Sequence, residues 1–342
     1  MLPLRLRLDT DALQVNWRAC DRLSGSAACG AAVKADGYGL GATGVVSRLA
    51  DAGCRDFFVA TWAEARALAP LGLPLSVLHG VREEDMEDAL AGFARPVLNT
   101  PTQVARWKAA GGGACDVMVD TGMNRLGLST GDVAAGLLDG VDIDTLMSHL
   151  ASADEDAPLN ERQRTAFAAL AGTTGARRMS LANSAGIALG ERYAFDLTRP
   201  GLALYGGVPR AEFEGIIRQV AFPEAQVLQR RLVRAGDTVG YNAAWTAPAD
   251  TQVAILNMGY ADGYPRALSN GGVAEAGGAT LPVIGRVSMD LIAIAVDAAP
   301  YLKEGDWVQL DFTLPAVAVA AGRSQYEVLT GLGTRFDRTA WG

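Results

Sequence analysis

Apolar and polar positions alternate along the chain in two different rhythms. Up to about residue 220, short runs of Val, Leu and Phe are separated by longer alanine-rich stretches whose apolar positions recur every three or four residues. The short runs predict buried strands, and the longer stretches predict amphipathic helices. Eight strands are expected, at residues 30–33, 57–60, 75–78, 96–98, 116–119, 145–148, 178–181 and 195–197. Helices are expected at residues 10–23, 62–71, 84–91, 100–110, 160–171 and 184–189.

This alternation of elements predicts the fold of the first part of the chain. Strands that alternate with helices pair in parallel through right-handed crossovers. Eight such units predict an α/β architecture in which residues 8–221 form an N-terminal TIM-type (β/α)8 barrel. An open, doubly wound sheet is the alternative arrangement of the same elements.

The second rhythm begins at about residue 222. Short apolar segments separated by Gly, Pro or Asp turns are typical of an antiparallel β-domain. We therefore expect a mainly antiparallel β C-terminal domain over residues 222–342, with which residues 1–7 are candidates to pair. Its strands are expected at 225–233, 251–257, 280–284, 291–296 and 307–311, followed by one helix at 324–332.

Composition then narrows the classes of function. The chain has 30 Lys and Arg against 38 Asp and Glu, a formal net charge of −8, which argues against binding to nucleic acid or to an anionic membrane surface. Its 4 cysteines lack CxxC spacing and it has only 2 histidines, so we expect no metal site. Because the N-terminus carries two arginines and no long apolar stretch, we expect neither a signal peptide nor a membrane anchor, and a cytoplasmic protein.

Chemically active side chains follow the predicted barrel strands. Reactive groups in such barrels lie where a strand ends and the next loop begins. The first strand leads into Lys34 and the fifth into the loop that carries Arg125. The last three strands lead into His149, Ser184 and Arg199. One rim of the barrel is therefore expected to hold a lysine, two arginines, a histidine and a serine.

Lys34 follows the apolar run Gly-Ala-Ala-Val, so its amine is expected at the mouth of a buried strand. Loss of water there would lower its pKa and suit it to form a Schiff base and to carry a proton. The structural alternative is a lysine that extends its amine from the strand end into solvent. The next loop contains GLGATG at residues 39–44, a match to the dinucleotide-binding glycine pattern that favours a nicotinamide-dependent oxidoreductase. However, the acidic residue nearest the second strand is Glu64, inside the following helix.

The other motifs also have structural alternatives. Arg199 leads into Gly201, where the backbone N–H groups of a strand-to-helix turn can face a phosphate, or it can be a salt-bridged rim arginine. His149 can be a core histidine, and Asn183 can be a helix cap. In the second domain, the loop Gly-Tyr-Ala-Asp-Gly places Tyr260 directly after an apolar strand. A simple turn would explain its glycines but not its tyrosine and aspartate.

With these motifs located, the sequence resembles the alanine racemases over essentially its whole length. The resemblance is carried by eight segments in the family's order and at similar spacing: VKADGYGLGA, VDTGMNRLG, SHLASAD, ANSAG, TRPGLALYG, GYADGYPR, GRVSMD and YEVLTGLGTR. Any one of these segments is a weak signal, whereas eight in order are a strong one.

The resemblance implies the cofactor pyridoxal 5′-phosphate (PLP), bound covalently to Lys34. It implies that Arg199 faces the pyridine nitrogen. Because a guanidinium keeps its proton, the nitrogen would stay unprotonated and the ring would be a weaker electron sink. Further cofactor contacts are implied for Tyr38, Asn183, Ser184 and the backbone of Gly201 and Leu202.

The same resemblance implies a two-base mechanism. Lys34 and Tyr260 would serve opposite faces of the substrate Cα, and His149 with Arg199 would lower the pKa of the tyrosine through a hydrogen-bond relay. Arg125 would pair with the substrate carboxylate. The Met289 backbone N–H would contact the same carboxylate. In the family Tyr260 and Met289 reach the site from a partner subunit, so a homodimer with shared active sites is implied.

Three positions depart from the family pattern. Many members have a lysine two residues before Asp-Thr-Gly, where its carbamate steadies the catalytic arginine, and here that position is Met118. Some relatives have a histidine where this chain has Ser180, which shortens the relay behind Arg199. A tyrosine that narrows the pocket in some relatives corresponds to Thr334, so serine turnover is a hypothesis for this chain.

The function implied by the resemblance is PLP-dependent interconversion of L- and D-alanine, which supplies D-alanine for peptidoglycan. A racemase with serine or broader amino-acid specificity is the first alternative. A related PLP enzyme without racemase activity is the second, and an NAD-dependent oxidoreductase is the third. The partners implied are a small amino-acid substrate and a second copy of the chain.

Overall fold

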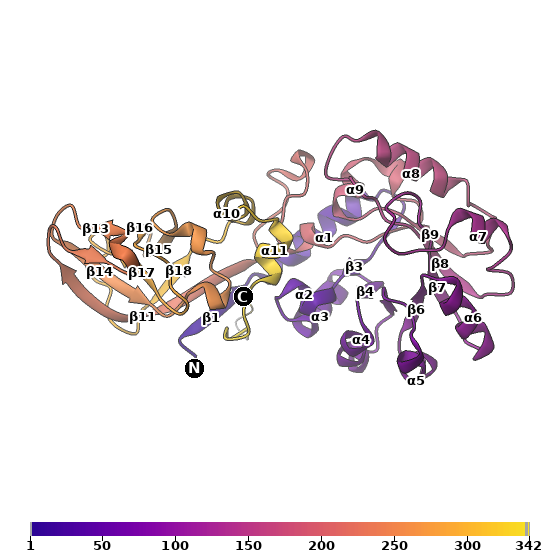
Figure 1. The fold of residues 1–342 in the computed structure, drawn as a ribbon, viewed down its shortest axis with the longest axis horizontal. Coiled ribbons are helices and arrows are strands. Elements are labelled where there is room, and N and C mark those ends of the chain that lie inside the picture. The colour runs from indigo at the N-terminus through magenta and orange to yellow at the C-terminus, as the bar shows by residue number, and fades with distance from the viewer. Residues whose placement is uncertain (1, 339–340, 342) are drawn as a thin grey trace. The chain divides into compact units, whose positions relative to one another are not determined.

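The computed structural model of the chain describes residues 2–338 and 341. The chain forms two compact units, which we describe separately. One is Leu13–Arg218, and the other combines the described residues of Met1–Ala12 and Gln219–Gly342. Figure 1 shows short strands with outer helices in the first unit and long antiparallel strands in the second.

Parallel strands form the centre of unit Leu13–Arg218. Seven of them lie in the order β3-β4-β5-β6-β7-β8-β9, so that strands consecutive in sequence are neighbours in the sheet. The strands of this unit are β2 (Ala28–Cys29), β3 (Ala31–Ala32), β4 (Phe57–Val59), β5 (Leu75–Val77), β6 (Arg95–Leu98), β7 (Cys115–Met118), β8 (Ile143–Met147), β9 (Arg178–Ser180) and β10 (Leu197–Thr198).

The sheet closes into a barrel at its two ends. β10 pairs in parallel with β2, which Gly30 joins to β3. On its other side, the segment around β10 is hydrogen-bonded to the segment around β9, from the Asp196 N–H to the Met179 carbonyl (3.0 Å) and from the Arg199 N–H to the Ala182 carbonyl (2.8 Å). The predicted eight-stranded barrel is therefore confirmed, and the open doubly wound sheet is wrong.

Helices surround these strands, and sequence signals mark where several of them begin. In α4 the Thr61 side chain accepts from the Glu64 N–H while the Glu64 carboxylate accepts from the Thr61 N–H, a capping box. α6 begins with Thr100 as its cap and Pro101 at its first position.

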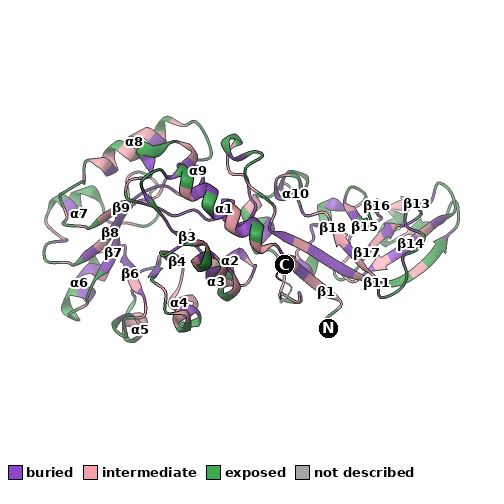
Figure 2. Cartoon of the chain, turned by 180° about the vertical axis from the view of Figure 1, so that it is seen from behind, coloured by how far each residue is buried: buried purple, intermediate pink, exposed green. Residues whose placement is uncertain are grey.

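Figure 2 shows the strands mostly buried and the outer sides of the helices exposed. The α-helices in this part of the chain are α1 (Thr10–Leu23), α2 (Lys34–Tyr38), α3 (Ala42–Ala52), α4 (Trp62–Leu68), α5 (Met86–Leu90), α6 (Pro101–Ala109), α7 (Thr130–Ala134), α8 (Pro158–Ala168) and α9 (Ser184–Ala188).

Three of these helices, α2, α3 and α7, were not among the predicted ones. The glycines at 39, 41 and 44 interrupt the apolar period near α2 and α3, and α7 has only five residues. Short 3₁₀ segments complete the unit, at Ala69–Leu71, Glu83–Asp85, Glu191–Tyr193, Leu202–Tyr205 and Ala211–Phe213.

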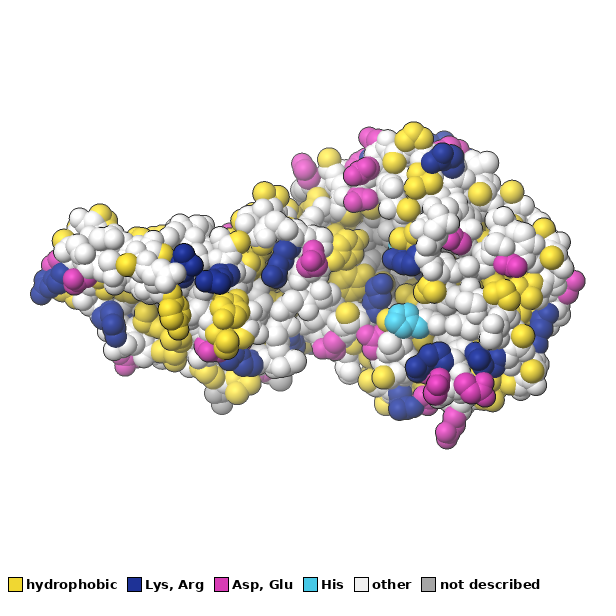
Figure 3. All heavy atoms as spheres, in the orientation of Figure 1, with side chains coloured by type: hydrophobic (Ala, Val, Ile, Leu, Met, Phe, Trp, Pro, Cys, Tyr) yellow, Lys and Arg dark blue, Asp and Glu magenta, His cyan; other side chains and the backbone are white. Residues whose placement is uncertain are grey.

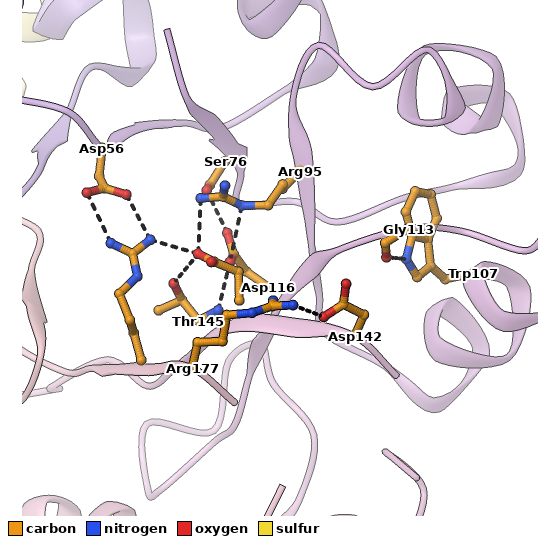
Figure 4. A network of polar contacts seen from close by, with 11 residues as sticks. Asp56, Ser76, Arg95, Trp107, Gly113, Asp116, Asp142, Thr145 and Arg177 are labelled. Atoms are coloured by element: carbon orange, nitrogen blue, oxygen red, sulfur yellow. Dashed lines mark hydrogen bonds and ion pairs between the residues drawn. The ribbon is translucent and has the colours of Figure 1, made fainter. Parts of the chain in front are cut away.

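A polar network joins the N-terminal ends of the barrel strands (Figure 4). At its centre is the fully buried Asp116 of β7, which accepts hydrogen bonds from the Ser76 hydroxyl (2.6 Å) and the Thr145 N–H (3.1 Å). Arg95 lies 3.5 Å from the Asp116 carboxylate and 3.3 Å from that of Asp144. Because reactive groups of such barrels lie at the opposite ends of the strands, we assign this network to stability.

The second unit is an antiparallel sheet. Its strands lie in the order β1-β11-β14-β17-β16-β15-β18, and an additional pairing of β18 with β11 closes the sheet on itself. β1 pairs with the first residues of β11, from Leu4 opposite Ala225 to Leu8 opposite Ala221. The strands are β1 (Leu4–Leu8), β11 (Ala221–Val233), β14 (Thr251–Leu256), β15 (Val273–Ala276), β16 (Ala279–Ile284), β17 (Ile292–Ala295) and β18 (Trp307–Leu310), with a separate hairpin of β12 (Thr238–Val239) and β13 (Trp245–Thr246).

Two α-helices belong to this unit. α11 (Gln325–Thr330) lies within the predicted helix, where Ser324 and Glu327 form a capping box. α10 (Leu314–Ala321) was not predicted, because its sequence LPAVAVAA is apolar at nearly every position and shows no helical period. Short 3₁₀ segments lie at Tyr241–Ala243, Tyr260–Asp262 and Arg266–Leu268. Among the described residues, no helix has the length and apolar character needed to cross a membrane.

The network at the base of the barrel generates a stability prediction. Asp116→Ala removes a fully buried carboxylate and leaves Ser76, Arg95 and the Thr145 N–H without this acceptor. We expect the free energy of unfolding to fall by about 3 kcal/mol, measured by urea denaturation. The matched control is Asp142→Ala, which removes a half-exposed ion pair with Arg177 (2.6 Å) and is expected to cost less than about 1 kcal/mol. Equal losses in the two variants would contradict the role of Asp116.

Candidate active site

Lys34 follows β3 at the mouth of the barrel and is partly buried. Burial lowers the pKa of its amine, and the positive charges of Arg125 and Arg199 lower it further, while Glu64 opposes them. Glu64 also holds the adjacent backbone, because its Oε1 accepts from the Ala35 N–H at 2.6 Å. A lysine in this environment is a better nucleophile and proton carrier at neutral pH than an exposed one.

The backbone directly after Lys34 makes a left-handed turn. Ala35, Asp36, Gly37 and Tyr38 have φ of 53°, 53°, 62° and 57°. This conformation is unfavourable for residues with a Cβ atom, so surrounding contacts must hold it. One such contact is the hydrogen bond from the Ala42 N–H to the Asp36 carboxylate (2.8 Å). Residues 39–44 thus form the exit from this turn and the start of α3, within a closed barrel that lacks the switch point of dinucleotide-binding sheets.

Backbone and side-chain donors converge at the loop that follows β10. The buried Ser184 hydroxyl accepts from the Gly201 N–H (2.9 Å) and the Ala203 N–H (3.2 Å). A Cβ atom on Gly201 would overlap the Tyr38 hydroxyl, so only glycine allows this approach. The hydroxyls of Ser184 and Tyr38 therefore meet at the Gly201 turn, whose N–H groups hold Ser184, and such a polar cluster suits a phosphate group.

The predicted neighbours of these donors lie nearby in the chain. Asn183 caps α9, because its side chain accepts from the Gly186 N–H at 2.8 Å. The structure thus shows the helix-cap role that the sequence offered for this residue. Leu202 begins a buried 3₁₀ turn whose residues are all enclosed. The turn from 202 to 205 is therefore enclosed by the barrel unit.

Tyr38 is held by an aromatic partner that we did not predict. Its ring stacks on that of Tyr205, with centroids 4.6 Å apart and planes inclined by 23°. The buried Tyr205 hydroxyl donates to the Ala32 carbonyl at 2.8 Å, which anchors the stack to β3. Tyr205 lies in the segment TRPGLALYG, but nothing in the sequence indicated which surface it would pack against.

Arg199 is buried inside the barrel mouth. Its guanidinium donates to the Ser148 carbonyl (2.6 Å) and to the Ser180 hydroxyl. Burial lowers its pKa to about 10, which the charge of Asp116 partly offsets, so the group remains a cation at neutral pH. Ser180 thus lies behind Arg199, as expected for the position at which some relatives were said to have a histidine. The alternative of a salt-bridged rim arginine is wrong for Arg199, because its partners are a carbonyl and a hydroxyl.

His149 follows β8, beside the same cations. Burial and the positive charges of Arg199, Arg125 and Lys34 lower its pKa to about 3, so the imidazole is neutral at physiological pH. Its backbone carbonyl accepts from the buried side chain of Gln163 (2.9 Å). Gln163 also accepts from the Ala151 N–H (2.9 Å) and thereby fixes the whole loop. We did not predict Gln163, because it lies on α8, away from every motif.

Arg125 lies in a tight loop between β7 and α7. Asp120 accepts from the N–H groups of Gly122 and Met123, each at 2.8 Å, and a Cβ atom on Gly127 would lie 2.5 Å from the Asp120 nitrogen. The arginine itself is exposed, and it makes no hydrogen bond or ion pair with any residue that the structure describes. It is therefore available to an anionic ligand.

Met118, one of the three positions that depart from the family pattern, lies in an apolar cluster. Its neighbours there are Phe58, Val97, Met147 and Leu197. These side chains offer no polar group to a carbamate. Asn124, the residue before Arg125, has a backbone φ of 56°, in the left-handed region.

The positive charges of Arg125 and Arg199 lower the pKa values of both Lys34 and His149, so these four residues lie close together on one rim, as predicted. Figure 3 shows Lys or Arg side chains beside a recessed area on the barrel unit. Such a concentration of positive charge favours a small ligand with several negative groups. A reactive amine, a phosphate-type donor set and a further cation fit PLP and an amino-acid carboxylate.

The remaining predicted residues lie in the second unit. Tyr260 and Met289 are both about half exposed, at 43% and 53%. Backbone hydrogen bonds join their loops, from the Tyr260 N–H to the Ser288 carbonyl and from the Ala261 N–H to the Met289 carbonyl, each 3.0 Å. The structure therefore brings Tyr260 and Met289 together, on a loop pair separate from the barrel residues described above.

Comparison with known proteins identifies the family. The family model for the alanine racemase N-terminal domain matches residues 8–209, and that for the C-terminal domain matches residues 220–340. An alanine racemase of Acidiphilium cryptum is 42% identical over 97% of this chain and 97% of its own. A catabolic alanine racemase of Agrobacterium fabrum is 41% identical over 98% of this chain and 91% of its own.

A solved structure extends the likeness to the fold. The alanine racemase of Bartonella henselae with covalently bound pyridoxal phosphate is 33% identical, with a TM-score of 0.88 over 98% of this chain and 99% of that one. Both domain models and the full-length relatives agree with the barrel and the antiparallel unit. The chain belongs to the alanine racemase family.

Proposed function

We propose that this chain uses PLP to interconvert L- and D-alanine, with Lys34 and Tyr260 as opposing bases. The observation that carries the proposal is Lys34 itself, an amine with a lowered pKa at the barrel mouth, beside the donor set of Ser184 and Gly201. Residues 8–221 would form the PLP-binding domain, and residues 222–342 would supply Tyr260.

Side chains and backbone groups of the barrel unit would hold the cofactor. Lys34 would bind it covalently, and Arg199 would donate a hydrogen bond to its ring nitrogen. Tyr38, Ser184 and the backbone of Gly201 and Leu202 would bind the phosphate, with Asn183 fixing that loop. When bound, PLP withdraws electrons from the bonds at the substrate Cα. Arg199 keeps its proton, so it would leave the ring nitrogen unprotonated and make the ring a weaker electron sink than a protonated ring.

The protein would then move one proton at each face of Cα. Lys34 would exchange it on one face and the Tyr260 hydroxyl on the other. An ordinary tyrosine has a pKa of about 10, so its hydroxyl needs a cationic environment to act as a base. Arg199 would provide that charge through His149. Because the His149 imidazole is neutral, one of its nitrogens can accept a hydrogen bond while the other donates one.

Arg125 and the Met289 backbone N–H would bind the substrate carboxylate. The exposed guanidinium of Arg125, which pairs with no carboxylate among the residues the structure describes, supports this role. Two contacts from separate directions would fix the carboxylate, and with it the orientation of the Cα–H bond. Proton transfer depends strongly on that orientation.

We further propose a cytoplasmic homodimer with shared active sites, in which Tyr260 and Met289 complete the partner's barrel site. Its D-alanine would serve peptidoglycan synthesis. The exposure of Tyr260 and Met289 in the single chain supports the shared site, since catalytic groups at work are enclosed by a neighbouring surface.

The first test is the formation of D-alanine from L-alanine by the PLP-supplemented protein. We expect Lys34→Ala to abolish both racemisation and the visible absorbance of the lysine-bound cofactor. Tyr260→Phe is expected to keep that absorbance and to lower turnover by roughly a hundredfold or more, through loss of one proton transfer. An inactive wild type that still binds PLP would refute the proposed reaction.

Mixing the two variants tests the shared site. After dissociation and reassociation, hybrid dimers would combine an intact Lys34 and an intact Tyr260 in one of their two sites. About a quarter of all sites would then be complete, and activity would return to about that level. No recovery from a mixture that sedimentation shows to contain dimers would mean that each site lies within one chain.

The pKa of His149 generates a prediction of pH dependence. The folded chain holds this pKa at about 3, below the value of about 6.5 in an unfolded chain. The unfolded state therefore binds the proton first, so the stabilisation is complete above about pH 6.5 and is lost as pH falls toward 3. In cofactor-free protein, the free energy of unfolding is expected to fall as pH drops from 7 to 4.5. His149→Gln is expected to make this fall smaller, by up to about 1.4 kcal/mol for each pH unit below 6.5. His79→Gln, the control, is expected to behave as wild type, and a His149→Gln curve parallel to wild type would contradict the prediction.

Thr334 generates a prediction of substrate range. A side chain smaller than tyrosine at this position would leave room for the serine hydroxymethyl group. We expect measurable racemisation of L-serine, and we expect Thr334→Tyr to lower the ratio of serine to alanine kcat/KM by about tenfold. The wild type is the reference, assayed with both amino acids at the same cofactor loading. Complete absence of serine turnover in the wild type would reject the hypothesis.

A further inference from the structure

Arg335 joins the two loops that carry Tyr260 and Met289. Its guanidinium donates to both carboxylate oxygens of Asp262, from Nε at 2.6 Å and from Nη2 at 2.7 Å. Its third nitrogen, Nη1, donates to the carboxylate of Asp290 at 2.7 Å. Asp262 lies two residues after Tyr260, and Asp290 lies directly after Met289. One side chain therefore contacts both loops.

The contact with Asp262 is a buried one. The Asp262 side chain is 1% exposed, and its carboxylate also accepts from the Gly259 N–H at 2.9 Å. Asp262 thus closes the 3₁₀ turn that contains Tyr260, and Arg335 supplies its countercharge. A buried carboxylate without a paired cation is strongly destabilising, so the turn depends on the arginine. The half-exposed Asp290 depends on it less.

The backbones around this ion pair are packed directly against one another. A Cβ atom on Gly263 would lie 2.5 Å from the Gly331 carbonyl oxygen, and one on Gly333 would lie 2.7 Å from the Ala261 carbonyl oxygen. A Cβ atom on Gly259 would overlap the Met289 carbonyl. The Tyr260 turn therefore lies between the Met289 loop and the 331–333 segment with no side chain between them. A small shift of Arg335 would move all three segments.

We propose that Arg335 is a positioning residue, which sets the Tyr260 hydroxyl through Asp262 and the Met289 backbone N–H through Asp290. This inference rests on the proposed function, because it takes Tyr260 as a base and Met289 as a carboxylate contact. The sequence signal was the terminal arginine of YEVLTGLGTR, to which no role could be given without knowing its carboxylate partners.

The test uses the PLP-loaded enzyme and alanine that carries deuterium at Cα. In Arg335→Gln, we expect turnover to fall by roughly ten- to a hundredfold, because a misplaced base loses proton-transfer efficiency. The deuterium isotope effect is expected to rise for the enantiomer whose Cα–H faces Tyr260 and to stay unchanged for the other. A purely structural role would lower turnover without this asymmetry, and that result would overturn the proposal.

Two further variants complete the test. Asp290→Ala leaves the buried pair with Asp262 intact, and we expect it to raise KM for alanine several-fold with kcat nearly unchanged. It also keeps the proposal testable if Arg335→Gln does not fold, since an unchanged KM would overturn the link to Met289. The matched control is Arg234→Gln, which removes an exposed ion pair with Asp250 in the same unit and is expected to behave as wild type.

The outcomes separate this inference from the proposed function. If Tyr260→Phe retained full racemisation, the two-base assignment itself would fail, and the role of Arg335 with it. If Tyr260→Phe lost activity while Arg335→Gln showed wild-type isotope effects for both enantiomers, only the role of Arg335 would be refuted.

Discussion

Parallel pairing of the barrel strands is the constraint on which the rest of the structure depends. Because all the strands of a closed parallel barrel point the same way, residues that follow different strands must meet on one rim. Lys34 follows β3, His149 follows β8 and Arg199 follows β10, and the closure of β10 against β2 brings the last of these back to the first. The opposite ends of the strands are joined by the network around Asp116, so stability and chemistry are assigned to different ends of one sheet.

Once several cations share a rim, each alters the proton affinity of the others. Burial and mutual repulsion lower the pKa values of Lys34 and His149, while Arg199 remains charged even with its pKa lowered to about 10. The three groups therefore differ in charge. Arg199 is a permanent cation, Lys34 is an amine that loses its proton more easily than usual, and His149 is a neutral imidazole. Such a gradient suits proton transfer near neutral pH better than identical groups would.

Much of this arrangement could be predicted from the sequence, and the missing parts have a common cause. The strands and the reactive residues at their ends were found because both depend on local pattern. Glu64, Gln163 and Arg335 were missed as positioning residues because each contacts groups distant in sequence. The capping-box spacing of Thr61 and Glu64 predicts a helix start but not a second bond to Ala35. The left-handed turn after Lys34 was also missed, because surrounding contacts rather than residue preference hold Ala35 and Asp36 in it.

The apolar surroundings of Met118 have a consequence for the chemistry of the solution around the enzyme. A lysine carbamate forms only by reaction with dissolved carbon dioxide, so an enzyme that relies on one is tied to the supply of that gas. Met118 packs against Phe58, Val97 and Met147 and has no amine to react. The backbone of the loop that carries Arg125 is held by Asp120 and by the close approach at Gly127. Position 118 of this chain therefore cannot make the site depend on dissolved carbon dioxide.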